Sequence, residues 1–344
     1  MLRVPYSDLY ETLKKAMERL GLAEERAALC ARLFAETTRD GVYTHGLNRF
    51  PHFAAAVQNG SVDVQAEATR TVGVGSLERW DGRRGVGNLN AFAAMHRAME
   101  LARQHGIGGV ALANTNHWMR GGTYGWLAAE AGLFAMCWSN TLANMPAWGA
   151  TTPTVGNNPL VIAVPRPGRH TAANHDFAAG PIVLDMAMSQ FSYGTLAAYS
   201  KHGEPLPVDG GFDTDGNLTR DAAAIQASQR ALPVGYWKGS GLSLVLDMLA
   251  AMLSGGLATH QLSRDPFRES GQSQIFLAID PSTVASTLEL SQIAEGILAS
   301  FREATPAAPN KPVRYPGEET LLLREENMRL GIPVDLEIWE EIDG

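Results

Sequence analysis

The sequence is poor in cysteine and contains no long hydrophobic run. Its two cysteines, Cys30 and Cys137, lie far apart and support neither a disulfide framework nor a cysteine-rich zinc site. The longest apolar stretch, residues 242–253, is interrupted by Ser243 and Asp247 and is too short to cross a bilayer. No apolar segment of signal-peptide length occurs near the first residue. These absences predict a cytoplasmic protein that does not enter a membrane.

Several common nucleotide-binding and hydrolase motifs are also missing. Gly73 and Gly75 follow a predicted strand, but Glu78 occupies the third glycine position of the G-x-G-x-x-G fingerprint. There is no G-x-x-x-x-G-K-[ST] loop, no H-E-x-x-H pair and no G-x-S-x-G elbow. If a nucleotide binds, the usual dinucleotide fold does not hold it. The formal net charge of −8 argues against a nucleic-acid partner, although it is compatible with a locally positive site for a small anion.

The distribution of apolar residues indicates more than one lobe. A chain of 344 residues exceeds the size at which one hydrophobic core usually stops growing. The first 60 residues show helical spacing, with Leu9, Leu13 and Met17 on one face. Beyond about residue 70, short strand patterns alternate with helical ones. We predict an α+β fold without a Rossmann unit, in which a helical N-terminal lobe joins a mixed-sheet α/β lobe.

The same shifts in pattern predict the boundaries of three parts. In order, these are a helical lobe at 1–70 joined by 305–344, a central α/β lobe at 71–165 and 240–304, and an intervening segment at 166–239 that carries surface loops. Within the last part, residues 166–180 are small and polar and read as a surface loop. Residues 241–253 form a predicted helix that is hydrophobic on most sides, so we expect it to be buried.

The most informative segment for chemistry is 41–50, which contains Thr44, His45 and Arg49. An imidazole can give or take a proton at cellular pH because its unperturbed pKa lies near neutrality. A guanidinium can hold a carboxylate through two parallel hydrogen bonds. This combination suits an enzyme that acts on a small keto or hydroxy acid. The structural alternative is a helix-end His45 capped by Thr44, with Arg49 on a solvated face.

Three other segments can carry chemistry, and each has a structural alternative. His117, in a strand-end loop, can bond a substrate oxygen or the nicotinamide amide, or it can simply stack on Trp118. Asp185 follows another predicted strand and can orient a histidine or cap the next helix. Lys238 lies at a predicted helix start, where backbone N–H groups and a lysine suit a phosphate. Its alternative is a solvated side chain.

Taken together, these segments resemble the malate/L-lactate dehydrogenase family, whose members lack the Rossmann fold. The resemblance covers nearly the whole chain, and runs of this length are far more specific than any single motif above. The matching runs are 41–46, 48–51, 116–122, 124–126, 188–189, 191–194, 206–213, 216–219 and 235–241.

The resemblance implies a homodimeric enzyme that uses NADH or NADPH, with NADH slightly favoured, and a helical lobe beside an unusual α/β cofactor lobe. By the family pattern His45 is the catalytic proton donor, and Asp185 orients or tunes a catalytic group. Thr44, Arg49 and His117 are the implied substrate contacts, and no metal is implied. The implied cofactor-binding residues are Pro181, Ile182, Val183, Leu184, Asp185, Met186, Ala187, Trp237, Lys238, Gly317, Glu318 and Glu319.

The resulting hypothesis is hydride transfer from the nicotinamide to a 2-keto acid, with His45 protonating the developing alkoxide. The runs around Trp118 and Trp237 favour the family members that reduce the sugar acid 2,3-diketo-L-gulonate. Oxidation of malate, lactate or ureidoglycolate and reduction of a cyclic imine are alternatives within the family. A metal-dependent hydrolase using His45, His52 and His117 is a second class, disfavoured because ligand spacing is lacking. An inactive binding protein on the same scaffold is a third.

The chain departs from the family pattern at four places. Thr44 stands where serine is expected, although a hydroxyl is retained. Thr151 stands where the nearest family members have lysine, and Glu318 stands where they have histidine. The loop at 166–180 is longer than expected. Because of Thr151 and Glu318, the sequence leaves open the exact keto acid and the choice between NADH and NADPH.

Overall fold

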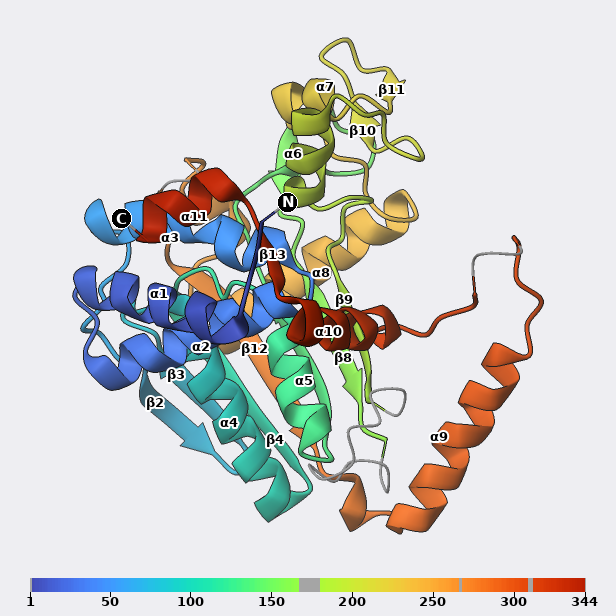
Figure 1. Ribbon diagram of the computed structural model, residues 1–344. Helices are drawn as coiled ribbons and strands as arrows, with labels where there is room; N and C mark the ends of the chain where they lie inside the picture. Colours follow the sequence, from blue (N-terminus) through green and yellow to red (C-terminus); the bar gives the residue numbers. More distant parts are fainter. Residues whose placement is uncertain (1, 167–179, 266–267, 309–311, 344) are drawn as a thin grey trace.

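A seven-stranded mixed sheet forms the centre of the molecule (Figure 1). The computed structural model describes residues 2–166, 180–265, 268–308 and 312–343. The loop predicted at 166–180 falls mainly on 167–179, outside the described residues. In the order in which they pair, the strands are β2 (Thr69–Val74), β3 (Leu77–Asp81), β4 (Ile107–Thr115), β12 (Gln272–Ile279), β5 (Phe134–Ser139), β8 (Leu160–Val164) and β9 (Ile182–Met186).

The pairing in this sheet differs from that of a doubly wound nucleotide-binding fold. Only β3 and β4 run parallel, with Leu77 opposite Gly109, while every other neighbouring pair in the sheet is antiparallel. A Rossmann sheet is mostly parallel. Strand β12 comes after all the other strands of this sheet in the sequence, but it lies between β4 and β5. The prediction of a mixed-sheet, non-Rossmann α+β fold is confirmed.

Successive side chains of a strand point to opposite faces of the sheet, and each face packs against its own hydrophobic core. On one face, Val110 and Phe276 join the core beneath α4 (Gly87–His105) and α5 (Gly122–Glu130). On the other face, Ala111 and Ile275 pack with Leu246 of α8 (Trp237–Ser254). Consecutive residues of one strand therefore serve opposite cores.

The N-terminal helices and the C-terminal residues share one core. It is built by α1 (Tyr6–Arg19), α2 (Glu24–Arg39), α3 (Phe50–Gln58) and α11 (Leu336–Asp343). The short strands β1 (Leu2–Val4) and β13 (Ile332–Val334) pair antiparallel, and α10 (Glu318–Leu330) leads into β13. The two ends of the chain thus lie side by side, although the three-part division of the chain stays a prediction.

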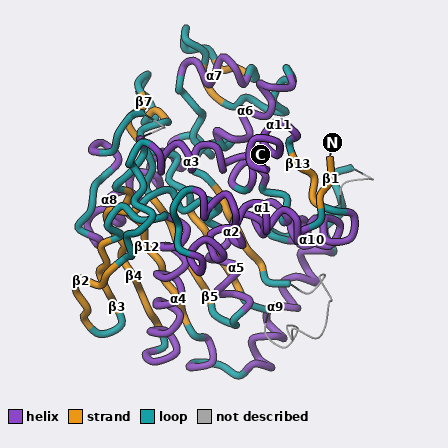
Figure 2. The backbone as a smooth tube through the Cα atoms, turned by 60° about the vertical axis from the view of Figure 1, so that its left-hand side comes forward, coloured by secondary structure: helices purple, strands orange, loops and turns teal. Residues whose placement is uncertain are grey.

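A small separate lobe lies at one end of the molecule in both views (Figures 1 and 2). It contains α6 (Tyr193–His202), α7 (Ala222–Ser228) and the two-stranded sheet of β10 (Gly211–Phe212) and β11 (Leu218–Thr219). Its own core includes Leu196, Leu206 and Ile225. A further short pair, β6 (Met145–Pro146) and β7 (Pro153–Val155), lies on the chain between β5 and β8.

The expectation that the helix at 241–253 is buried was wrong. Helix α8 buries Ser243, Leu246 and Ala250 against the sheet but leaves the rest of its apolar surface open. The exposed residues of α8 include Leu242, Leu244, Val245, Met248, Leu249, Met252 and Leu253. A helix that is hydrophobic all round predicts burial, but one chain supplies a partner for only one side of α8.

Helix α9 (Thr287–Arg302) shows the same property, and it extends along the outside of the molecule (Figure 1). Its exposed apolar side chains are Leu288, Ile293, Ile297 and Phe301. Within the described part of the chain, no helix is long and apolar enough to span a membrane.

Candidate active site

The segment that carries His45 is held against the end of α2 by Thr38. After α2, the chain forms two single-turn 3₁₀ helices, η1 (Tyr43–His45) and η2 (Leu47–Arg49), before α3 begins. Thr38 Oγ1 donates to the carbonyl of Phe34 at 2.8 Å and accepts the N–H of Leu47 at 2.9 Å. Gly46 lies so close to Thr38 that a Cβ would collide with it. These contacts fix the position of η1 relative to the helical lobe.

His45 lies between a hydroxyl and a second imidazole. Its Nδ1 is 3.0 Å from Thr44 Oγ1, and its ring stacks on that of His117 with the centroids 5.9 Å apart. Burial lowers the pKa of His45 to about 4, and the charges of Arg49 and Arg120 act in the same direction. The imidazole of the free protein is therefore neutral at pH 7.

His117 is held by the backbone and does not stack on Trp118. The N–H of Met119 donates to His117 Nδ1 at 3.1 Å, which leaves Nε2 to carry the proton of a neutral ring. Burial lowers the pKa of His117, with Arg49 adding to the effect. The Trp118 ring instead packs on Tyr124 in the core beneath α4 and α5. The stacking alternative proposed from the sequence is thus replaced by contact with His45.

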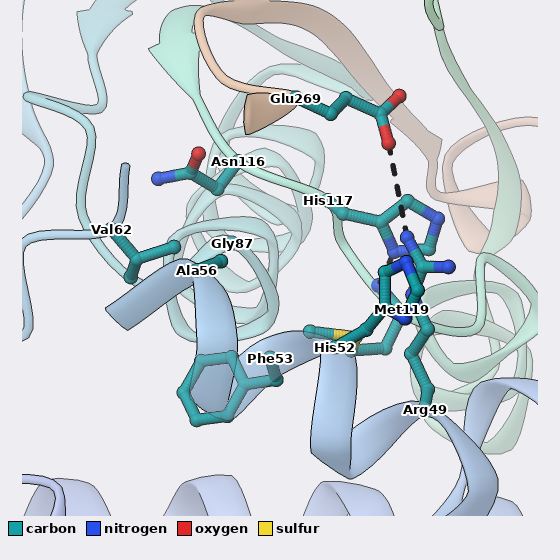
Figure 3. A pocket seen from close by; sticks show the side chains of 10 residues that line it. All are labelled: Arg49, His52, Phe53, Ala56, Val62, Gly87, Asn116, His117, Met119 and Glu269. Atoms are coloured by element: carbon teal, nitrogen blue, oxygen red, sulfur yellow. Dashed lines mark hydrogen bonds and ion pairs between the residues drawn. The ribbon is translucent and has the colours of Figure 1, made fainter. Parts of the chain in front are cut away.

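Arg49 faces Glu269 and does not lie on a solvated helix face. Figure 3 shows the Glu269 carboxylate directed at the Arg49 guanidinium, with His117 beside them. The closest atoms, Arg49 Nη2 and Glu269 Oε2, are 3.8 Å apart, while Glu269 Oε1 accepts a 2.8 Å hydrogen bond from Gln272 Nε2. Burial lowers the pKa of Arg49 and raises that of Glu269. At this separation the pair compensates the buried charges incompletely, so Arg49 can accept a further carboxylate.

Two adjoining cavities share His45 on their walls. One has a volume of about 410 Å³ and continues to Arg120 and Asp185. The other has a volume of about 320 Å³ and continues to Arg49 and Glu269. Both volumes fall within the range that is usual for small-molecule binding sites. The residues common to both cavities are Thr44, His45, His117, Thr141, Asn157 and Ser192.

Asp185 caps a helix, but not the one expected. Its Oδ2 accepts the N–H of Gly122 at 2.8 Å, at the start of α5, whereas the next helix along the chain, α6, is capped by Ser192. Asp185 lines the 410 Å³ cavity, as His45 does. Burial raises the pKa of the Asp185 carboxyl group, and the charge of Arg120 opposes that rise. Burial outweighs the charge of Arg120, so the pKa of Asp185 lies above its ordinary value.

Arg120 is held in place by a buried ion cluster. Its Nη1 donates to Asp40 Oδ2 at 2.7 Å, and Arg324 Nη2 donates to the same oxygen at 2.8 Å. Burial raises the pKa of Asp40, but the two arginines lower it by more, so it lies below its ordinary value. Arg120 Nε is buried and has no hydrogen-bond partner among the described residues. Arg120, which lines the cavity at Asp185, therefore carries a buried donor that no described residue engages.

A third cavity, of about 300 Å³, adjoins the one at Asp185 and also contains Arg120. Of the cofactor residues implied by the resemblance, five line these two cavities, namely Val183, Leu184, Asp185, Ala187 and Gly317. Gly317 has φ +94° and lies against Trp126 and the backbone of Val183. Because Gly317 has no side chain, this part of the cavity stays open beside Trp126 and the backbone of Val183.

The other implied cofactor residues do not line these cavities. Glu318 pairs with Arg302 at 2.7 Å, and Glu319 pairs with Arg314 at 3.2 Å. Trp237 and Lys238 are exposed at the start of α8. The N–H groups of Lys238 and Gly239 already donate to the carbonyls of Gly235 and Val234, so these N–H groups are unavailable for the anion site predicted at 237–241. The remaining three, Pro181, Ile182 and Met186, also lie outside both cavities.

Sequence reasoning missed three charged residues of the site, namely Asp40, Arg120 and Glu269. Arg120 lay within the run 116–122, but nothing marked it as a buried ion-pair partner. Asp40 and Glu269 carry no local motif at all. Thr151 is exposed between β6 and β7 and lines neither cavity at His45. Among the described residues, no group of three or more His, Cys, Asp or Glu side chains could hold a metal ion.

The chain is similar to known enzymes along its whole length. A model of the malate/L-lactate dehydrogenase family matches residues 4–343. A 2,3-diketo-L-gulonate reductase from Klebsiella pneumoniae is 45% identical over 342 residues, covering 99% of each chain. The solved malate dehydrogenase from Pyrococcus horikoshii has a TM-score of 0.86 at 25% identity, covering 99% of this chain and 93% of the other. The Δ1-piperideine-2-carboxylate reductase structure from Pseudomonas syringae gives 0.85 at 26% identity, covering 100% and 99%.

A mixed non-Rossmann sheet with a histidine between two cavities defines a class of oxidoreductase distinct from the doubly wound dehydrogenases. The chain belongs to the malate/L-lactate dehydrogenase family. The resemblance seen in the sequence is confirmed, and so is the prediction of an oxidoreductase. Family membership implies a nicotinamide cofactor. The cavity at Asp185 fits such a group, because Arg120 on its wall has a buried Nε without a partner among the described residues.

Proposed function

We propose that the protein is a nicotinamide-dependent reductase of 2,3-diketo-L-gulonate. The observation that carries the proposal is the position of His45 on the shared wall of two cavities, one with Asp185 and one with Arg49. A reductase needs this arrangement, because its proton donor must reach a carbonyl that lies between a hydride donor and a carboxylate clamp. The substrate is chosen from the name of the relative at 45% identity.

The residues of the chain supply binding and proton transfer. When bound, the reduced nicotinamide supplies the hydride. Arg49 holds the substrate carboxylate, and His45 donates a proton to the oxygen of the 2-keto group as that oxygen becomes negative. Thr44 Oγ1, 3.0 Å from His45 Nδ1, orients the ring. Because the free imidazole has a lowered pKa, the negative charge of the bound keto acid promotes its protonation at the moment it is needed.

His117 and Asp185 support this chemistry from either side. The ring of His117, stacked on His45, presents Nε2 as a donor for a second substrate oxygen. Asp185 lies on the cofactor side, where its carboxyl group orients or tunes a catalytic group from the wall that it shares with Arg120. The same imidazole of His45 can take the proton back, so the enzyme can also oxidise the hydroxy acid.

The residues that would hold the cofactor are Val183, Leu184, Asp185, Ala187 and Gly317, with Arg120 as a further donor. NADH is slightly favoured over NADPH. Two arginines of the C-terminal segment, Arg302 and Arg314, are already paired with Glu318 and Glu319, so among the described residues neither is free for the additional phosphate of NADPH. The roles of Pro181, Ile182, Met186, Trp237 and Lys238 stay predictions of the family pattern.

A cytoplasmic homodimer completes the proposal. The apolar faces of α8 and α9 support the dimer, because exposed apolar surface of this extent is typical of a protein interface. Surfaces of this kind usually pair with the same surfaces of a second copy.

The proposal is tested by following nicotinamide absorbance with NADH and with NADPH against a panel of acids. The panel contains 2,3-diketo-L-gulonate, pyruvate, oxaloacetate and Δ1-piperideine-2-carboxylate, together with L-malate in the oxidative direction. We expect the highest kcat/KM for the diketo acid with NADH. A higher kcat/KM for the cyclic imine or for malate would assign the chain another activity of its family, and no turnover of any substrate would overturn the proposal.

A further inference from the structure

The cavity that contains Arg49 also has walls supplied by the small lobe. Gln226 and Gln229 from the end of α7, together with Arg264, line this 320 Å³ cavity. They do not line the 410 Å³ cavity at Asp185 or the small cavity between Arg49 and Met119. These three residues therefore line a part of the substrate cavity that belongs neither to the cofactor side nor to the small cavity.

These three side chains are open to solvent, since Gln229 and Arg264 are exposed and Gln226 is half-buried. Within the described part of the chain, no hydrogen bond or ion pair engages the side chains of Gln226, Gln229 or Arg264. Each amide can both donate and accept, and the guanidinium can donate. The small cavity near Arg49 differs in character, because Phe53, Ala56 and Val62 contribute to its walls.

The backbone at Gln229 provides a second, independent observation. Gln229 has φ +55° and ψ +33° at the C-cap of α7, in the left-handed region. Glycine or asparagine adopts this conformation at less cost. Strained non-glycine residues cluster at functional sites, where the side chain is needed for something other than the fold. A glutamine in this conformation at the wall of a cavity is consistent with that role.

The small lobe is fixed to the catalytic segment, so the amides have a defined place. Gly194 at the start of α6 lies against Thr44, where a Cβ would come within 2.7 Å of the Thr44 Cβ. The hydroxyl of Tyr193 donates to the carbonyl of Asn144 at 2.5 Å. Ile225 of α7 packs in the core that also holds Leu196 of α6. The contact at Thr44 thus couples the position of α7 to that of His45.

We propose that Gln226, Gln229 and Arg264 form a subsite for the hydroxyl-bearing end of the substrate. This inference rests on the proposed function, because it assumes that Arg49 holds the carboxylate. A polyhydroxy chain presents alternating donors and acceptors, which amide groups match and an apolar wall does not. A three-carbon keto acid has no such chain. The subsite therefore selects long hydroxylated keto acids over short ones.

The test compares two substrates in matched variants. In Gln226→Leu, which keeps the size of the side chain but loses both amide functions, kcat/KM for 2,3-diketo-L-gulonate should fall about tenfold or more. The value for pyruvate should be unchanged. Gln229→Gly should produce the same selective loss and also raise the melting temperature, because it relieves the left-handed backbone. The control is Gln104→Leu, an exposed glutamine near the end of α4, which should alter neither substrate.

Equal losses for both substrates would make α7 a structural element and overturn the subsite. A fall for 2-oxoglutarate in Arg264→Met, without a fall for the polyhydroxy acid, would show that Arg264 binds a distal carboxylate and would also overturn it. If the unaltered protein reduces no keto acid, the proposed function fails separately. The subsite is then tested by calorimetry with L-gulonate, and equal affinity in the unaltered protein and in Gln226→Leu would overturn it.

Discussion

At the scale of single residues, the chemistry depends on a histidine that the fold keeps neutral. Burial beside two arginines lowers the pKa of His45 to about 4. A neutral imidazole is a poor acid until an anion binds nearby, so proton donation is coupled to substrate binding. The loosely paired side chains of Arg49 and Glu269 are a second feature on which the chemistry depends. Their separation of 3.8 Å leaves the guanidinium able to accept a carboxylate.

Replacing His45 by glutamine tests the proton donor. His45→Gln should lower kcat for keto-acid reduction by about 10² or more, because glutamine cannot donate a proton to the developing alkoxide. Cofactor affinity, measured by fluorescence titration, should stay close to that of the unaltered protein. A variant with near-normal kcat would remove His45 from the mechanism.

The lowered pKa of His45 also predicts a pH profile. Above about pH 4 the protonated fraction of the free enzyme falls roughly tenfold per pH unit. The kcat/KM for reduction should therefore fall as pH rises from 5 to 8, whereas kcat/KM for oxidation, which needs the neutral ring, should stay flat over that range. Initial rates in both directions provide the measurement. A reductive profile that is flat to pH 8 would contradict the assignment.

Arg49 is tested by a conservative and a neutral substitution. Lysine keeps the charge but loses the planar fork, so Arg49→Lys should lower kcat/KM for keto acids at least tenfold, and Arg49→Met should lower it further. The cofactor KM should change little, because Arg49 lies on the wall of the other cavity. Unchanged kcat/KM in both variants would leave Arg49 as a partner of Glu269 alone.

At the scale of elements, two consecutive threonines at the end of α2 have different tasks. Among the described residues, Thr37 Oγ1 donates to the carbonyl of Leu33, within its own helix, and makes no other hydrogen bond. Thr38 Oγ1 makes the corresponding bond to Phe34 and in addition accepts the N–H of Leu47. Both are buried. Of the two hydroxyls, that of Thr38 is therefore the one that bonds to the segment carrying His45.

This difference supplies a matched pair of variants. Thr38→Val leaves the buried N–H of Leu47 without an acceptor, which should cost about 1–3 kcal/mol of unfolding free energy. It should also lower kcat by displacing η1. Thr37→Val has the same chemistry but leaves η1 in place, so its kcat should be nearly normal. Urea denaturation and steady-state kinetics measure both effects, and equal kcat values in the two variants would show that Thr38 does not position His45.

At the scale of the whole molecule, the exposed apolar faces of α8 and α9 are the main unexplained surface of a single chain. Met252 is 70% exposed and Ile297 is 65% exposed. Apolar side chains in such numbers are costly to leave in water. A second copy that covers them would explain both faces at once.

Charged substitutions on these faces test the dimer. Met252→Glu and Ile297→Glu should each shift the protein toward monomers in analytical ultracentrifugation, because a buried unpaired carboxylate is strongly unfavourable at an interface. The control is Leu218→Glu, which places the same charge on the exposed β11 strand of the small lobe. Sedimentation of the unaltered protein as a monomer would contradict the proposed homodimer.

The elements themselves were predictable because their signals are local. The helical spacing of Leu9, Leu13 and Met17 is that of α1, and the short strand patterns expected beyond about residue 70 supply the central sheet. Periodicity depends only on neighbours in the sequence. The segment with Thr44, His45 and Arg49 was recognisable for the same reason, since its residues lie within six positions.

The partners of those residues depend on contacts distant in sequence. Glu269 reaches Arg49 from a position 220 residues further along the chain, and Asp185 caps α5 through Gly122. The helix at 241–253 was misjudged because hydrophobicity reports that a surface avoids water, without saying which surface covers it. By itself, the sequence determined much of the secondary structure, the family and the histidine–arginine pair, because each of these depends on residues that are close together in the sequence. Only the tertiary structure decided that His45 adjoins two cavities and that α8 stays open, because both depend on how distant segments pack.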